Sequence, residues 1–220
     1  MCGRFVLFTE SLLEEVGEWE SITEVHAPEG LPPARYNIAP TQPVAIVRVE
    51  DNTARVDPAR WGLLPHWKKD MDGPPLFNAR AETVATKPSF RDAFKAQRCV
   101  IPLDGYYEWK AGDEPKAKKQ PYYVTGPHGL LWAAGLWATG MDRLSATMVT
   151  TEATEEMAWL HGRLPKFLTQ DEIAPWLAGE ALLEPSSVHG FNARPADPAV
   201  GNVRNDYAEL IDEQPSSTLF

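Results

Sequence analysis

The spacing of hydrophobic and polar residues near the start of the chain is that of an amphipathic helix. The stretch "TESLLEEVGEW" places its apolar side chains on one helical stripe: Leu12, Leu13, Val16 and Trp19. Ser11 and Glu14 have the spacing of a capping box at the start of such a helix. We therefore expect a helix here that packs its apolar stripe against a core.

The next apolar stretches have the shorter period of β-strands. After a proline-rich stretch, "PVAIVRVE" (43–50) predicts a strand, and "TARVDPARWGLLP" (53–65) predicts its hairpin partner. Helical spacing returns in "KPSFRDAFKAQ" (87–97), where Ser89 is a candidate N-cap. The side of this helix expected to pack inward carries Phe90, Ala93, Phe94 and Gln97.

From Cys99 to about Ala153 the pattern predicts consecutive strands separated only by turns. The predicted strands are "CVIP", "GYYEWK", "QPYYVTG", "GLLWAAGLWATG" and "SATMVTTEA". Two helices follow, "TEEMAWLH" and "TQDEIAPWLAGE", the second opened by Thr169 with Glu172 at capping-box spacing. Strands without helices between them favour antiparallel pairing. We expect one α+β domain over 1–220, built on a strongly bent, mainly antiparallel, open-barrel-like sheet with helices at its margins.

Composition and charge restrict the classes of function. A chain of 220 residues, 43% hydrophobic and 24% charged, is typical of one globular domain. It has no basic start followed by an apolar stretch and no long apolar run, so we expect a cytoplasmic protein with no membrane partner. We also expect a monomer. The formal net charge of −10 argues against general nucleic-acid binding, so any DNA contact requires a local basic groove.

Cysteine and histidine spacing gives no sign of a metal or disulfide framework. The chain has two cysteines, Cys2 and Cys99, and five histidines without an H-x-x-x-H pair. Cys99, in "RCVIP", is expected to be a small buried hydrophobic residue in a strand. We predict no structural metal and no cofactor.

Cys2 directly follows the initiator methionine and is small enough for that methionine to be removed. The mature chain would then carry an α-amine, with an unperturbed pKa of roughly 7.7–8.0, and a thiol on one residue. Such an amine can form a Schiff base with an aldehyde, and the thiol can close a thiazolidine on the same carbon. The alternative is an incidental cysteine at a disordered terminus.

Three internal stretches carry further candidate residues. In "FNARAET" the side chains of Asn78, Arg80 and Glu82 would share one face of an extended segment, although a solvated strand edge with one ion pair has the same pattern. Glu108, in "GYYEWK", is either a carboxylate with a raised pKa among aromatic residues or a side chain facing water. His161, in "HGRLP", is either a proton carrier beside an anion site or a structural residue at a helix end.

Taken together, the ordered motifs of this chain resemble the SRAP family of abasic-site processing proteins, also called SOS response-associated peptidases. The resemblance runs from residue 2 to about residue 211, which leaves 212–220 as a flexible tail. Its motifs are "MCGRF", "RYNIAPTQ", "RWGLLPHW", "NARAET", "KPSFRDAF", "RCVIPLDGYYEWK", "KQPYY", "AAGLW", "TTEA", "HGRLP" and "GNVRND".

The resemblance implies a function in the response to DNA damage. Members bind single-stranded DNA and crosslink the terminal cysteine to the ring-opened deoxyribose of an abasic site, with an autocatalytic peptidase activity and a possible lyase activity. Carried over by motif, Cys2 is the nucleophile, Asn78 holds the sugar or phosphate, and Glu108 and His161 transfer protons. The implied DNA contacts are phosphate binding by Arg4, Arg80 and Arg163, and base stacking by Trp67 and Trp61. The protein would associate with the nucleoid when bound to DNA.

One departure from the family pattern and three rival hypotheses remain open. The family's histidine motif usually has an acidic residue where this chain has Gly162, which could make His161 slower in proton transfer. Glutamine amidotransferases with an N-terminal nucleophile also begin Met-Cys-Gly, but no Asn-Gly pair occurs here. The second rival is a non-covalent single-stranded DNA-binding module, and the third is a peptidase that acts on other proteins.

Overall fold

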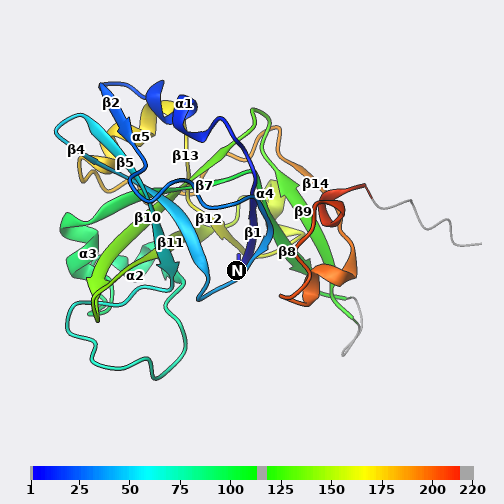
Figure 1. Ribbon diagram of the computed structural model, residues 1–220. Coiled ribbons are helices and arrows are strands. Elements are labelled where there is room, and N and C mark those ends of the chain that lie inside the picture. Colours follow the sequence, from blue (N-terminus) through cyan, green and yellow to red (C-terminus); the bar gives the residue numbers. More distant parts are fainter. Residues whose placement is uncertain (1, 113–117, 214–220) are drawn as a thin grey trace, which may run out of the picture.

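The computed structural model describes residues 2–112 and 118–213 of the 220-residue chain. Most of the predicted tail, residues 214–220, therefore lies outside the described residues. The fold is mainly β, and its strands form two sheets with helices around them (Figure 1).

Five strands of the larger sheet form a closed, barrel-like ring. They are β4 (Pro43–Glu50), β5 (Thr53–Trp61), β7 (Arg98–Leu103), β10 (Leu131–Gly140) and β11 (Arg143–Glu152). Antiparallel pairs join β5 to β4, β4 to β7, β7 to β10 and β10 to β11, and a parallel pair of β11 with β5 closes the ring. Four short strands extend this sheet: β2 (Glu24–His26), β6 (Asn78–Arg80), β12 (Arg163–Pro165) and β13 (Phe167–Leu168).

The second sheet has five strands in the order β14-β9-β8-β1-β3, and all its pairs are antiparallel. Its strands are β1 (Arg4–Leu7), β3 (Arg35–Ile38), β8 (Gly105–Lys110), β9 (Gln120–Thr125) and β14 (Asn192–Pro195). Phe5 of β1 packs edge-on against Trp61 of the barrel, with ring centroids 5.0 Å apart. The core is therefore continuous between the two sheets. Strand β1, which directly follows Cys2, contributes to this contact.

Short helices lie at the margins of the sheets (Figure 1). They are α1 (Leu12–Gly17), α2 (Ala81–Val84), α3 (Arg91–Ala96), α4 (Glu155–Ala158), α5 (Gln170–Leu177) and the 3-10 turns η1 (Pro198–Gly201) and η2 (Ala208–Ile211). In the described part of the chain, none of the helices has the length and apolar character needed to cross a bilayer.

The predicted fold class is confirmed, and the barrel closes completely rather than staying open. Three local predictions were wrong. Ser11 donates to the Glu15 carboxylate (3.0 Å) instead of forming a capping box with Glu14, and the N-cap of α3 is Phe90 rather than Ser89. The extended segment of "FNARAET" ends at Arg80 and α2 begins at Ala81, so Glu82 does not alternate along a strand with Asn78. The Thr169–Glu172 capping box of α5 is confirmed.

Candidate functional site

Cys2 lies fully buried just ahead of β1. The side-chain amide of Asn78 donates a 2.7 Å hydrogen bond to the Cys2 carbonyl oxygen. Asn78 is in turn fixed by the parallel pairing of β6 with β11, in which it lies opposite Met148. Within the described residues, the buried Asn78 Oδ1 has no hydrogen-bond partner. The start of the chain is therefore held in place by a strand of the barrel sheet, next to an acceptor that a substrate could use.

Glu108 is buried close to the Cys2 thiol, with 5% of its surface exposed. Its Oε1 accepts a 3.2 Å hydrogen bond from the Trp109 backbone N–H. Burial and, second, the nearby negative charge of Glu108 raise the pKa of the Cys2 thiol well above its ordinary value. The thiol is therefore protonated at neutral pH. The alternative in which Glu108 faces water is wrong, because the second sheet packs on the barrel at this point.

His161 follows α4 and precedes β12. Its Nδ1 accepts a 2.9 Å hydrogen bond from the Arg163 backbone N–H. The same Nδ1 lies 3.1 Å from the Arg163 carbonyl oxygen, so the backbone of Arg163 fixes the orientation of the ring.

Arg163 is engaged by protein groups on several sides. Its guanidinium forms a two-point ion pair with Glu82, at 3.1 and 3.0 Å, and donates to the Thr150 carbonyl oxygen at 2.7 Å. The hydrogen bond from Arg163 lowers the pKa of Glu82. The ion pair that the sequence suggested for this region therefore exists, but it joins Glu82 to Arg163 rather than to Arg80, whose side chain is exposed.

Arg4 ties the start of the chain to the segment containing "GNVRND". Its Nη1 donates to Asn37 Oδ1 (2.9 Å) and to the Val200 carbonyl oxygen (2.6 Å). Asn37, which is fully buried, donates to the carbonyl oxygens of Val200, Asn202 and Asn205. Asn37 had no predicted role, although a lone amide inside the apolar-flanked motif "RYNIAPTQ" was a usable signal. These contacts give Arg4 a structural role two residues from Cys2.

The two tryptophans of "RWGLLPHW" occupy opposite environments. Trp61 has no exposed surface, and its Nε1 donates to the Phe77 carbonyl oxygen at 2.9 Å. The prediction that Trp61 stacks on a base is therefore wrong, because the end of β5 carries it into the core. Trp67, on the segment between β5 and β6, is 50% exposed and remains available for stacking.

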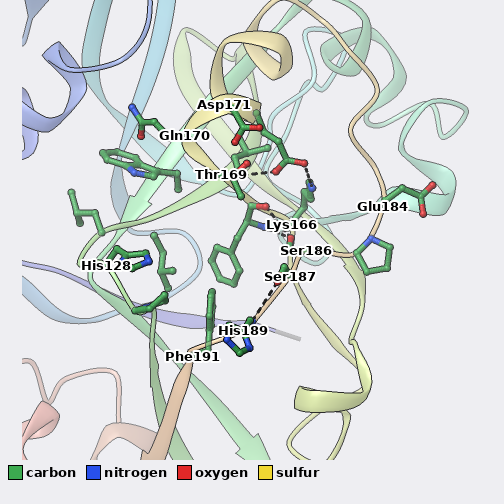
Figure 2. A pocket seen from close by; sticks show the side chains of 18 of the residues that line it. His128, Lys166, Thr169, Gln170, Asp171, Glu184, Ser186, Ser187, His189 and Phe191 are labelled. Carbon is green, nitrogen blue, oxygen red and sulfur yellow. Dashed lines mark hydrogen bonds and ion pairs between the residues drawn. The ribbon is translucent and has the colours of Figure 1, made fainter.

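A separate large cavity, of about 890 Å³, opens between α1, α5 and the turn before β10. Figure 2 shows Lys166 and Thr169 on one side of it and His189 and Phe191 on the other. Its aromatic wall is formed by Trp132, Phe167 and Phe191, and its carboxylates are Glu15, Glu18, Asp171, Glu172 and Glu184. None of the residues predicted to act in the site lines this cavity. Within residues 2–112 and 118–213, no cluster of three metal-ligating side chains is found.

A family model described as SOS response associated peptidase (SRAP) matches residues 1–203 of the chain. The chain belongs to the SRAP family. The abasic site processing protein YoqW of Bacillus subtilis is 35% identical over 96% of this chain and 99% of its own. YedK of Escherichia coli, also named an abasic site processing protein, is 32% identical with the same coverage.

A more distant relative and a solved structure are also similar to this chain. The abasic site processing protein HMCES of Xenopus tropicalis is 30% identical over 73% of this chain and 58% of its own. A crystal structure of a Bacteroides thetaiotaomicron protein has a TM-score of 0.76 at 22% identity, covering 90% of this chain and 93% of its own. At that identity the structural match establishes the shared fold. The predicted resemblance to the SRAP family is confirmed.

Proposed function

We propose that this SRAP protein captures abasic sites in single-stranded DNA through a covalent bond to Cys2. Its relatives from Bacillus subtilis and Escherichia coli are named abasic site processing proteins and align along nearly their whole length. The observation that carries the proposal is the placement of Cys2, whose carbonyl is held by Asn78 while Glu108 lies beside its thiol.

The proposed chemistry begins after removal of Met1 frees the α-amine of Cys2. The amine nitrogen attacks C1′ of the ring-opened deoxyribose aldehyde, and loss of water gives a Schiff base. The Cys2 sulfur then adds to the same carbon, the thiol proton ends on the nitrogen, and a five-membered thiazolidine closes. The second attack is intramolecular, where effective molarities reach roughly 10⁵ M or more.

The proposal assigns the two proton transfers to Glu108 and His161. Because the pKa of the Cys2 thiol is raised, its proton must be removed as sulfur attacks, and the adjacent Glu108 carboxylate is the acceptor. In its protonated form, His161 donates a proton to the carbinolamine oxygen, which leaves as water, and the neutral imidazole remains. Asn78 keeps the backbone of Cys2 in place through both steps.

Closing the ring also protects the DNA strand. A Schiff base at C1′ acidifies the C2′ hydrogen and promotes β-elimination, which breaks the strand. Thiazolidine closure returns C1′ to sp³ geometry and removes that electron sink, so crosslinking outcompetes lyase activity. In this proposal the peptidase activity is the removal of the protein's own leading residue.

DNA contact in this proposal depends on a small set of side chains. Arg80 and Arg163 contact phosphates, and a phosphate replaces part of the ion pair of Arg163 with Glu82. The exposed Trp67 stacks on a base. Arg4 holds the segment around Val200 and so positions β1. With a net charge of −10, we expect modest affinity for intact DNA that falls steeply with salt.

The test mixes purified protein, shown by mass spectrometry to start at Cys2, with a labelled single-stranded oligonucleotide containing one abasic site. A slow band on a denaturing gel is expected from wild type on abasic DNA, and from neither Cys2→Ala nor intact DNA. Absence of that band would reject covalent capture. Reversible binding without an adduct would then favour a plain binding module, and hydrolysis of glutamine or peptides that requires Cys2 would favour amide chemistry.

A further inference from the structure

Trp159 is an exposed aromatic side chain held in place by two neighbours. It lies between α4 and His161, and 46% of its surface is exposed. The Tyr122 ring packs edge-on against it, with centroids 5.2 Å apart and planes at 83°. The Lys110 ammonium lies 5.4 Å from the centre of the Trp159 ring. We call these three residues, Trp159, Tyr122 and Lys110, the Trp159 platform.

The Trp159 platform borders the proposed reaction site. Tyr122 is the cross-strand partner of Glu108 in the β8–β9 pair, so their side chains share one face of the sheet. Lys110 lies two residues beyond Glu108 on β8 and therefore points to the same face. Trp159 is two residues before His161, and Figure 1 shows α4 beside the β8–β9 part of the second sheet.

The chemistry of the Trp159 platform matches a nucleotide. An exposed indole offers a π surface on which any base can stack, and its contact with Tyr122 restricts the ring before the base arrives. The Lys110 ammonium supplies positive charge for a phosphate in a protein whose net charge is −10. At an abasic site the flanking base has lost its stacking neighbour, so its face is open to such a ring.

We propose that Trp159 stacks on the base next to the abasic site and that Lys110 contacts the phosphate of that nucleotide. This inference rests on the single-stranded DNA binding in the proposed function. It does not require the covalent step.

The experiment measures binding of a fluorescein-labelled intact single-stranded oligothymidylate by fluorescence anisotropy. Trp159→Ala is expected to weaken binding about 5- to 150-fold, the range found when a stacking aromatic is truncated. Trp159→Phe should retain most of the affinity, because a smaller ring still stacks. Lys110→Gln should reduce the slope of log affinity against log salt by about 0.7, the value for one phosphate contact on a single strand. Tyr207→Ala removes another exposed aromatic, 41% exposed on the C-terminal segment, and should change nothing.

The same variants are then tested for covalent yield at saturating abasic DNA, with thermal melting to confirm folding. Unchanged affinity of folded Trp159→Ala would overturn the inference while a normal adduct left the proposed function intact. Weakened binding by Trp159→Ala, in a protein that forms no adduct at all, would support the inference and reject the covalent chemistry. Failure of the wild type to bind any single-stranded DNA would overturn both.

Discussion

The surroundings of Cys2 and the cavity between α1 and α5 differ in both size and chemistry. Around Cys2 the groups are buried and hydrogen-bonded, and they bring together a thiol, an amide and a carboxylate. The cavity has about 890 Å³ of open space, and most of the charged side chains that line it are carboxylates. Size alone would select the cavity as the functional site. The proposed function selects the other region, because the capture of an aldehyde requires the amine and thiol of Cys2, and the carboxylates of the cavity repel DNA phosphates.

The surroundings of Cys2 and the cavity are separated by two aromatic rings, those of Tyr106 and Phe167. Tyr106 lies on β8 close to Cys2 and Glu108, and its ring packs 5.7 Å from that of Phe167, which lines the cavity. Burial, followed by the charges of Cys2 and Glu108, raises the pKa of the Tyr106 hydroxyl. The Tyr106 hydroxyl is therefore neutral. The packed rings of Tyr106 and Phe167 separate the surroundings of Cys2 from the cavity. Substitutions on either side test whether the regions act independently.

The largest expected effect is on the rate of crosslinking, after a substitution beside Cys2. Glu108→Gln should slow crosslinking about 10²- to 10⁴-fold, the usual loss when a group that transfers protons is removed. Removing the negative charge should also lower the pKa of the Cys2 thiol, because that charge helps to raise it. Single-turnover rates on denaturing gels measure the first effect. Glu184→Gln, at the exposed rim of the cavity, is the matched control, and an equal loss there would contradict the distinction between the regions.

The second prediction concerns stability on the cavity side. Lys166 is buried, its side chain 3% exposed, and its ammonium pairs with Glu172 at 3.0 Å. Glu172→Ala leaves that charge unpaired and removes the capping box of α5, so unfolding free energy should fall by about 3 kcal/mol. Lys166→Met removes the buried charge itself and should cost less than about 1 kcal/mol. Urea denaturation measures both.

The same two variants test the independence of the regions. Neither Glu172→Ala nor Lys166→Met should change the crosslinking rate of protein that is folded under the assay conditions. A slower rate in Lys166→Met, at unchanged stability, would show that the cavity wall communicates with the reactive region through Tyr106 and Phe167.

Most of the fold could be predicted because its elements have a clear period. The strand 43–50 was located to the residue, and its hairpin partner and the strands after Cys99 appear where the pattern placed them. Closure of the barrel could not be predicted, since it depends on a parallel contact between β5 and β11 that are far apart in sequence. Local pattern also placed the Ser89 cap wrongly, because the backbone turns one residue later, at Phe90.

The candidate site was predictable in its residues but not in their environments. Strand alternation left Glu108 undecided, and only the packing of one sheet on the other buries it. Trp61 and Trp67 belong to one motif, yet one ends a barrel strand and the other lies on the segment beyond it. Asn37 was missed because its partners are backbone carbonyls more than 160 residues away in the chain.

A third prediction separates Arg4, which holds the segment around Val200, from Arg80, which is proposed to contact DNA. Arg4→Gln removes the partner of the buried Asn37 Oδ1 and of the Val200 carbonyl, so unfolding free energy should fall by about 2 kcal/mol. Arg80→Gln, at an exposed position, should leave stability within about 0.5 kcal/mol. It should also lower the salt slope of single-stranded DNA binding by about 0.7. If Arg80→Gln lowered the stability and Arg4→Gln changed only the salt slope, the prediction would be contradicted.

The smallest expected effect tests the residue at which this chain departs from the family pattern. No heavy atom lies within 4 Å of where a Cβ on Gly162 would be, so Gly162→Asp fits without a clash. A carboxylate beside His161 favours the protonated imidazole, and an exposed pair of this kind contributes about 0.2–1 kcal/mol. The pH–rate profile of crosslinking should therefore move to higher pH by roughly 0.1–0.7 units. Gly162→Asn adds a side chain of similar size without a charge, so its pH–rate profile should match that of wild type. Indistinguishable profiles for all three proteins would show that a carboxylate at position 162 does not affect proton transfer by His161.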